Sequence, residues 1–223
     1  AWLRWLESGR WVWYAASLAC FVLAIYSKES GVVALGLQAL AVAFARKRRL
    51  RGVAAMTPFL LIAGFYAGAI FAARAGHLHF NDGTFSLSAP FWRTLVNSTR
   101  RLLWIWGLPA LAAVLWLRRR RYRFLLVAAC AWIVITFLPY SFLTYMPHVP
   151  SRHTYFASVG LSWLVGAGFG SMRPRLERWR SWAPAALAAL ILTHNCVYLW
   201  TRKQRQYRER AAPTEALVEF ART

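Results

Sequence analysis

A charged pair, Lys28-Glu29, separates two long apolar runs of the sequence, residues 11–26 and 31–45. Because a helix needs roughly 17–25 apolar residues to cross a bilayer, these runs predict a tight helical hairpin with the pair at its tip. Charge at a membrane boundary is costly unless it is paired, solvated or used to bind a ligand. The pair therefore has two interpretations: a solvated turn with a local ion pair, or part of a binding site.

A second polar segment, Arg152-His153, lies directly before an apolar run at residues 155–171. Pro147 and Pro150 keep the preceding chain extended, so the pair comes at the start of a predicted helix. Free N–H groups at a helix N-terminus and the fork of an arginine side chain both suit a phosphate. The alternative is an arginine that only anchors the helix end at the membrane interface.

Other polar residues have weaker claims to a functional role. His77, His79 and Asp82 carry atoms that bind divalent metals, but their spacing matches no metal motif and the segment is a good turn by itself. His194 and Asn195 lie within an apolar run, and we expect them to form hydrogen bonds inside a helical bundle. The sequence therefore predicts no metal site in this chain.

The composition is typical of a membrane protein. Of the 223 residues, 59% are apolar and only seven are acidic, and the formal net charge is +21. In a soluble protein this charge would indicate nucleic-acid binding. Here the basic residues cluster between apolar runs, as membrane topology signals do, so we expect membrane lipids and no nucleic acid as partners. The three cysteines lie singly in apolar runs, with no spacing typical of a metal or redox motif.

Seven apolar runs are long enough, or nearly so, to be transmembrane helices: residues 11–26, 31–45, 53–73, 102–117, 124–143, 155–171 and 182–200. The connectors at 46–51, 118–123 and 173–180 are short and strongly basic, which indicates the cytoplasmic side. The connectors at 27–30, 74–101 and 144–154 then face the opposite side, together with Lys28-Glu29 and Arg152-His153. Residues 90–101 predict an amphipathic helix on the membrane surface within this outer part. The predicted fold is an all-α, polytopic transmembrane helical bundle of about seven spans.

The chain is predicted to contain two parts. Residues 1–201 form a transmembrane helical domain, which we expect to be a fragment of a larger one, and residues 202–223 start a C-terminal extramembrane helical segment. Strict alternation puts the basic residues 201–205 outside, and a large outer domain that follows them would override their local charge. Pro213, Glu215, Leu217 and Phe220 predict an amphipathic helix in this tail.

Two motifs resemble those of a known family, the C-type membrane glycosyltransferases that carry tetratricopeptide repeats. The first is Ser27-Lys28-Glu29-Ser30-Gly31-Val32, which resembles the family's SKE(S/T)GV stretch. The second is residues 152–161, which resemble its RYLYLPSVGL segment, with His153 where the family usually has Tyr and Ala157 where it usually has Pro. The order and separation of the motifs are also similar, so the resemblance covers most of the chain.

The resemblance implies transfer of a sugar from a polyprenyl-phosphate carrier to a hydroxyl acceptor, at the extracytoplasmic face of the bacterial inner membrane. It implies that Lys28, Arg152 and His153 bind the carrier phosphate, and that Glu29 orients Lys28 or the hairpin. The family's key acidic residue lies in a first outer loop, upstream of the matching spans. The resemblance therefore gives this chain no catalytic residue and no cofactor, with a divalent cation possible in the full-length enzyme. Its partners would be the lipid-linked sugar and N-terminal spans of the same protein.

Two other classes of protein remain open. A lipid-pyrophosphate transferase of the O-antigen-ligase type would use arginine and histidine in place of a carboxylate. A transporter or a non-catalytic membrane scaffold is the third class. A transporter more often has charges and broken helices near mid-span, and a scaffold needs no cations gathered on one face.

Overall fold

The computed structural model describes residues 1–45, 49–76, 83–117, 120–144, 147–149, 153–172 and 182–221. Within these ranges every regular element is helical, and extended pairing is limited to one isolated bridge between Phe85 and Leu143. The prediction of an all-α protein is confirmed. Arg152, the predicted His77, His79 and Asp82 loop, and parts of the three basic connectors lie outside the described residues.

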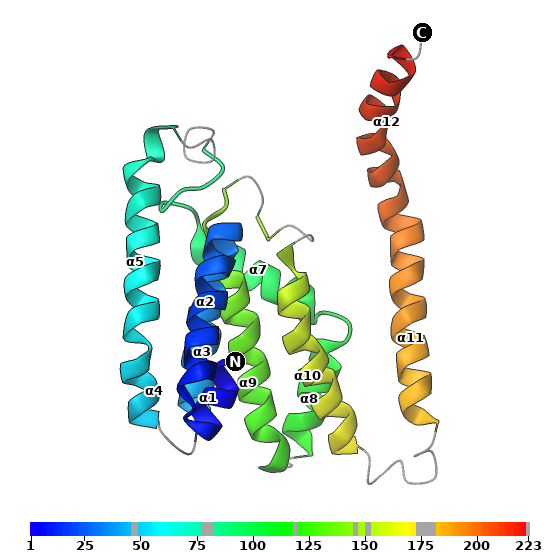
Figure 1. The fold of residues 1–223 in the computed structure, drawn as a ribbon. Coiled ribbons are helices and arrows are strands. Elements are labelled where there is room, and N and C mark those ends of the chain that lie inside the picture. The colour runs from blue at the N-terminus through cyan, green and yellow to red at the C-terminus, as the bar shows by residue number, and fades with distance from the viewer. Residues whose placement is uncertain are drawn as a thin grey trace. The chain divides into compact units, whose positions relative to one another are not determined.

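The chain divides into unit 1, Ala1–Ser171, and unit 2, Met172–Thr223. The helices assigned to unit 1 are α1 (Trp2–Ser8), α2 (Trp11–Ser27), α3 (Val33–Phe44), α4 (Arg49–Ala55), α5 (Thr57–Ala72), α7 (Phe91–Leu103), α8 (Gly107–Trp116), α9 (Arg120–Phe137) and α10 (Tyr155–Met172), with short 3₁₀ helices at Glu29–Val32, Arg74–Gly76 and Leu138–Phe142 (Figure 1). In unit 2, α11 (Ala183–Tyr198), a π-helical turn (Leu199–Lys203) and α12 (Gln204–Phe220) follow one another directly. The domain boundary near residue 201 stays a prediction.

Among the described residues, three helical stretches are long and apolar enough to cross a membrane. They are Arg49–Ala72 with 24 residues, Tyr122–Phe142 with 21, and Ala183–Lys203 with 21. They correspond to the runs predicted at 53–73, 124–143 and 182–200. The stretches Trp11–Ser27, Ser30–Phe44 and Gly107–Trp116 are apolar but shorter. Length and composition therefore support a membrane protein with three candidate spans.

The run at residues 102–117, predicted to be one span, is divided in the structure. Its first residues belong to α7, a turn follows at Trp104, and α8 has only 10 residues. Pro109 gives the physical reason, because a proline has no N–H to donate and its ring clashes with the carbonyl four residues earlier. A helix of this length extends about 15 Å, half the thickness of a bilayer core.

The first apolar core of unit 1 joins α1, α2, α3 and α5. Its buried side chains are those of Trp2, Leu6, Phe21, Ile25, Val42 and Phe59. The Trp2 indole N–H donates to the Gln38 carbonyl at 3.2 Å, so the short N-terminal helix is tied to α3. The turn between α2 and α3 is tight, because a Cβ at Gly31 would lie 2.6 Å from the carbonyl carbon and oxygen of Ala24.

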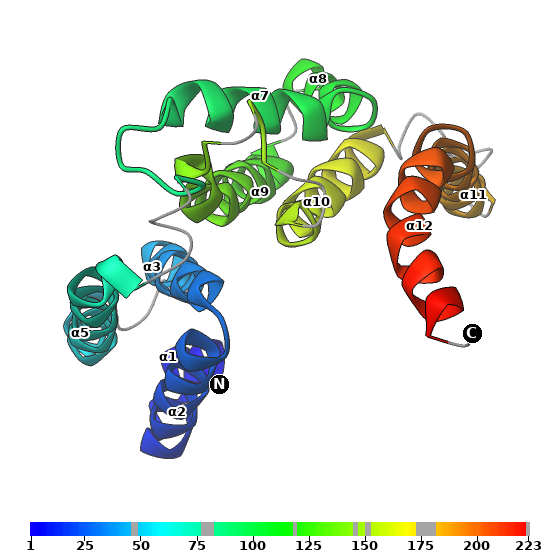
Figure 2. The same cartoon turned by 90° about the horizontal axis from the view of Figure 1, so that it is seen from above.

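Helix α7 runs across the direction of the longer helices of unit 1, near the end where α2 and α5 finish and α10 begins (Figures 1 and 2). Helices α3, α8 and α10 finish at the opposite end, next to the basic connectors (Figure 1). A second core, which includes Leu95, Ile133, Phe137, Tyr140 and Val149, fixes α7 against α9 and the start of α10. The amphipathic helix predicted at 90–101 is thus present as α7.

Candidate anion site on helix α7

Helix α7 has three faces of different character. Thr94, Leu95 and Ser98 are buried against the second core. Residues at spacings of 3, 4 and 8 share one side of a helix, so Arg93, Asn97, Arg100 and Arg101 form a polar face. The third face carries the exposed Trp92 and Val96. An amphipathic helix with arginines beside exposed tryptophan is typical of the membrane interface.

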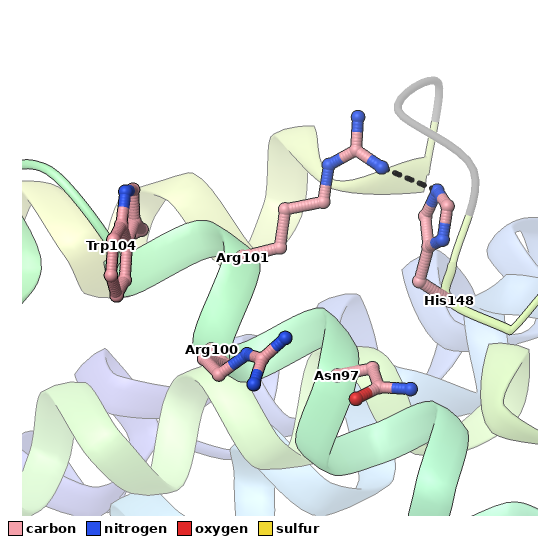
Figure 3. Close-up of a pocket in the computed structure, with 5 residues that line it drawn as sticks. All are labelled: Asn97, Arg100, Arg101, Trp104 and His148. Atoms are coloured by element: carbon pink, nitrogen blue, oxygen red, sulfur yellow. Dashed lines mark hydrogen bonds between the residues drawn. The ribbon is translucent and has the colours of Figure 1, made fainter.

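A cavity of about 520 Å³ opens beside the polar face of α7. Five residues line it, which are Asn97, Arg100, Arg101, Trp104 and His148. We call this the α7 cavity. Figure 3 shows Arg101 extended from the helix toward His148, while Arg100 and Asn97 lie lower on the same helix. Two guanidinium groups, an imidazole, an amide and an aromatic wall thus come together.

The 147–149 segment forms the other wall of the α7 cavity and is held by hydrogen bonds to α7. The Asn97 side-chain amide donates to the Pro147 carbonyl at 3.1 Å, and the Val149 N–H donates to the Ser98 hydroxyl at 2.8 Å. The Ser98 hydroxyl in turn donates to the Thr94 carbonyl at 2.6 Å. Val149 itself is only 2% exposed. The helix therefore fixes the backbone on both sides of His148.

Arg101 and His148 are in direct contact, with 2.5 Å between Arg101 Nη1 and His148 Nε2. A guanidinium has only donors and stays protonated, so Nε2 is the acceptor and the imidazole is neutral with its proton on Nδ1. None of the five lining residues is acidic. Within the cavity wall that the structure describes, the arginine charges therefore have no carboxylate counter-ion, and an oxyanion would complement them.

The structure describes two of the four predicted site residues with their side chains. Lys28 is exposed and ends α2, where its N–H donates to the Ala24 carbonyl at 3.0 Å. His153 is half-buried and stacks on Tyr140, with ring centroids 4.3 Å apart. Glu29 lies in a 3₁₀ turn, and its side chain is outside the described part, as is all of Arg152.

Lys28 directly follows α2, and His153 comes two residues before α10. The end of α2 and the start of α10 lie at the same end of unit 1 (Figure 1). His153 stacks on Tyr140, which belongs to the same core as Val149 next to the α7 cavity. Lys28 lies next to the α2–α3 turn. Arg152 and the side chain of Glu29 lie outside the described part, so a common site of the four predicted residues stays a prediction.

The five residues of the α7 cavity were not predicted from the sequence. One signal was present: the 74–101 connector contains Arg74, Arg93, Arg100 and Arg101 although alternation assigns it to the outer side. The positive-inside rule disfavours arginines on the outer side, so these arginines require another explanation. Nothing in the sequence links Arg101 to His148, which lies 47 residues further on.

No protein-family model matches this chain, and neither the curated proteins nor the solved structures include one with significant similarity to it. Over its described residues, the fold defines an all-helical protein with three helices long and apolar enough to cross a membrane, and the site is a cationic cavity beside the amphipathic helix α7.

Proposed function

We propose that the chain is the membrane part of a glycosyltransferase that transfers a sugar from a polyprenyl-phosphate carrier to a hydroxyl acceptor. The observation that carries the proposal is the α7 cavity, which offers Arg100, Arg101 and a histidine with no acidic residue in its described wall. The phosphate group of a lipid lies at the membrane interface, the depth at which an interfacial helix lies. Trp104 provides an apolar wall for the first carbons of the polyprenyl chain. The two motifs around Lys28 and Arg152 support the same class.

In this proposal cations stabilise the departing phosphate and no residue of this chain is the catalytic base. Charge that develops on a leaving phosphate is stabilised by positioned N–H donors. Arg100 and Arg101 supply such donors from α7. Lys28 follows the end of α2 and His153 precedes the start of α10, at the same end of unit 1 (Figure 1). The motif resemblance assigns Arg152 to the same role. The base, a carboxylate that removes the acceptor's proton, would come from sequence outside this chain.

We further propose that the chain crosses the bacterial inner membrane about seven times, with α7 on the extracytoplasmic side. After replacement of Cys20, Cys130 and Cys196, a cysteine introduced as Ser30→Cys or Ser151→Cys is expected to react with an impermeant thiol reagent in intact cells. Leu50→Cys, beside a basic connector, is expected to react only after permeabilisation. Labelling of Leu50→Cys in intact cells would reverse the orientation.

Lys28→Ala and Arg152→Ala test the function in the full-length protein. Removing one cation from a charged ligand at a water-poor interface costs about 2–4 kcal/mol, so we expect turnover of the polyprenyl-phosphate sugar to fall about 30- to 1000-fold. Arg152→Lys should also be impaired, because an ammonium cannot form the two parallel hydrogen bonds of a guanidinium.

Arg202→Ala, an exposed arginine of unit 2, is the matched control and should keep near-normal turnover. Near-normal turnover of both Lys28→Ala and Arg152→Ala, with correct membrane insertion, would mean that these residues are interfacial anchors only.

The second candidate function is a lipid-pyrophosphate transferase of the O-antigen-ligase type. One observation favours it: Arg101 and His148 are the closest polar pair of the α7 cavity. Such an enzyme uses arginine and histidine without a carboxylate, and its donor carries two phosphates. The donor that supports transfer distinguishes the two functions.

A further inference from the structure

We propose that the α7 cavity binds an oxyanion together with one proton, which His148 takes up from solvent when the anion enters. The proposal rests on the proposed function in one respect: there the oxyanion is the phosphate of the carrier lipid. The chemistry is the same for a phosphate on a lipid headgroup and for a free oxyanion. What is new is the coupling of binding to protonation.

The contact with Arg101 requires a neutral His148. Arg101 Nη1 lies 2.5 Å from His148 Nε2, and a guanidinium cannot accept a hydrogen bond, so the imidazole lone pair must point at Arg101. In this state one N–H of Arg101 is used by His148, and Nε2 has no proton to offer a ligand. The contact therefore occupies one N–H of Arg101 and leaves His148 Nε2 without an N–H to donate to a ligand.

Without a bound oxyanion, the charged groups around His148 oppose its protonation. Arg101 and Arg100 face it from α7, and Asn97 and Trp104 are neutral. The described part of its own segment contributes Pro147 and Val149, which do not titrate. A third positive charge beside two guanidinium groups is unfavourable, and an oxyanion that lies among them removes that repulsion.

The bound state exchanges one hydrogen bond for several. A proton from solvent adds to Nε2, the Arg101–His148 hydrogen bond breaks, and no covalent bond between heavy atoms forms or breaks. Protonated His148 then has N–H donors on both ring nitrogens, and Arg101 regains the N–H that it gave to His148. The anion can accept from Arg101, Arg100 and His148, each through a charge-assisted hydrogen bond.

Thermodynamic linkage gives the sign of the pH dependence. The complex with the oxyanion holds one more proton than the protein without it. The affinity for the oxyanion is therefore highest at low pH. It falls as pH rises through the titration range of histidine, near pH 6.5 for an ordinary imidazole. The loss above that range approaches about tenfold per pH unit for one proton. The hydrogen bonds of Asn97 and Ser98 to the 147–149 segment keep His148 in place in both states.

Titration calorimetry of the full-length protein with sulfate tests the proposal, because sulfate keeps its charge between pH 6 and 8. Measurements in two buffers with different heats of ionisation count the protons taken up. We expect an uptake approaching one proton per sulfate near pH 7.5, and affinity about tenfold weaker for each pH unit above the histidine range. His148→Gln keeps hydrogen-bonding groups but cannot become charged, so its sulfate affinity should be weaker at low pH and independent of pH.

His194→Gln on α11 is the matched control and should keep the uptake of the unmodified protein. Sulfate binding by the unmodified protein without proton uptake would overturn the proposal, as would the same uptake in His148→Gln or no sulfate binding at any pH. Proton uptake on sulfate binding to the unmodified protein tests the proposal even if His148→Gln does not fold.

Competition by lipid vesicles separates this proposal from the proposed function. Phosphatidylcholine vesicles that contain polyprenyl phosphate should displace sulfate, and vesicles with phosphatidylglycerol at the same charge should not. If only the phosphatidylglycerol vesicles displace sulfate, the proton-coupled site binds bulk acidic lipid. That result would contradict the assignment of the cavity to the carrier lipid.

Discussion

The double variant Arg100→Ala/Arg101→Ala of the full-length protein is expected to lose about 10³- to 10⁴-fold in kcat/KM for the polyprenyl-phosphate sugar, equivalent to about 4–6 kcal/mol. Both guanidinium groups line the α7 cavity, and no lining residue is acidic. Removing them leaves His148 as the single group there that can carry a positive charge. The loss should appear mainly in kcat if the arginines bind the departing phosphate more strongly than the donor.

Arg93→Ala is the control for this variant. Arg93 belongs to the polar face of α7 but does not line the cavity. An exposed surface charge contributes about 0–1 kcal/mol, so we expect less than about a fivefold change. Equal losses in Arg93→Ala and in the double variant would mean that α7 acts through its general charge at the membrane surface and that the cavity is not a site.

Gly31→Ala is expected to destabilise the α2–α3 hairpin by about 1–3 kcal/mol, the usual cost of overpacking a tight contact. The added Cβ would lie 2.6 Å from the carbonyl carbon and oxygen of Ala24 and 2.7 Å from the Ile25 nitrogen. These are backbone atoms of α2, so no side chain can rotate away, and the 3₁₀ turn Glu29–Val32 must move away from α2. Thermal unfolding of the purified protein in detergent measures the effect.

Gly64→Ala in α5 is the matched control, because it adds the same methyl group to an apolar helix where no atom lies within 4 Å. Alanine favours a helix over glycine by about 0.5–1 kcal/mol, so this variant should be as stable as the original or slightly more stable. A Gly31→Ala protein as stable as Gly64→Ala would contradict the close approach of the 3₁₀ turn at Gly31 to the end of α2.

The helical hairpin at Lys28 was predictable from the sequence because its signal is local. The run predicted at 11–26 is observed as α2, Trp11–Ser27, and the apolar run after the pair contains α3. Two long apolar stretches with a short polar break leave few other arrangements. The close approach at Gly31 was not predictable, since it depends on the angle at which the backbone leaves α2.

The predicted amphipathic helix at 90–101 is α7, Phe91–Leu103, but the prediction did not extend to its cavity. The periodicity of one helix shows which residues share a face, and gives no information on what lies opposite. The partner of Arg101 comes from a segment after α9, so only the packing of α7 against α9 brings the two together. The run 102–117 was predicted as one continuous helix, but the chain turns at Trp104 and α8 begins at Gly107.

The identity of the donor is the most direct measurement of the proposed function. Full-length protein in sealed vesicles would receive the same labelled sugar on polyprenyl phosphate, on polyprenyl pyrophosphate and on a nucleotide. We expect transfer to a hydroxyl acceptor from the polyprenyl-phosphate sugar alone, with one polyprenyl phosphate released for each sugar transferred. Transfer from the pyrophosphate donor or the nucleotide donor alone, or no transfer from any lipid donor, would contradict the proposed function.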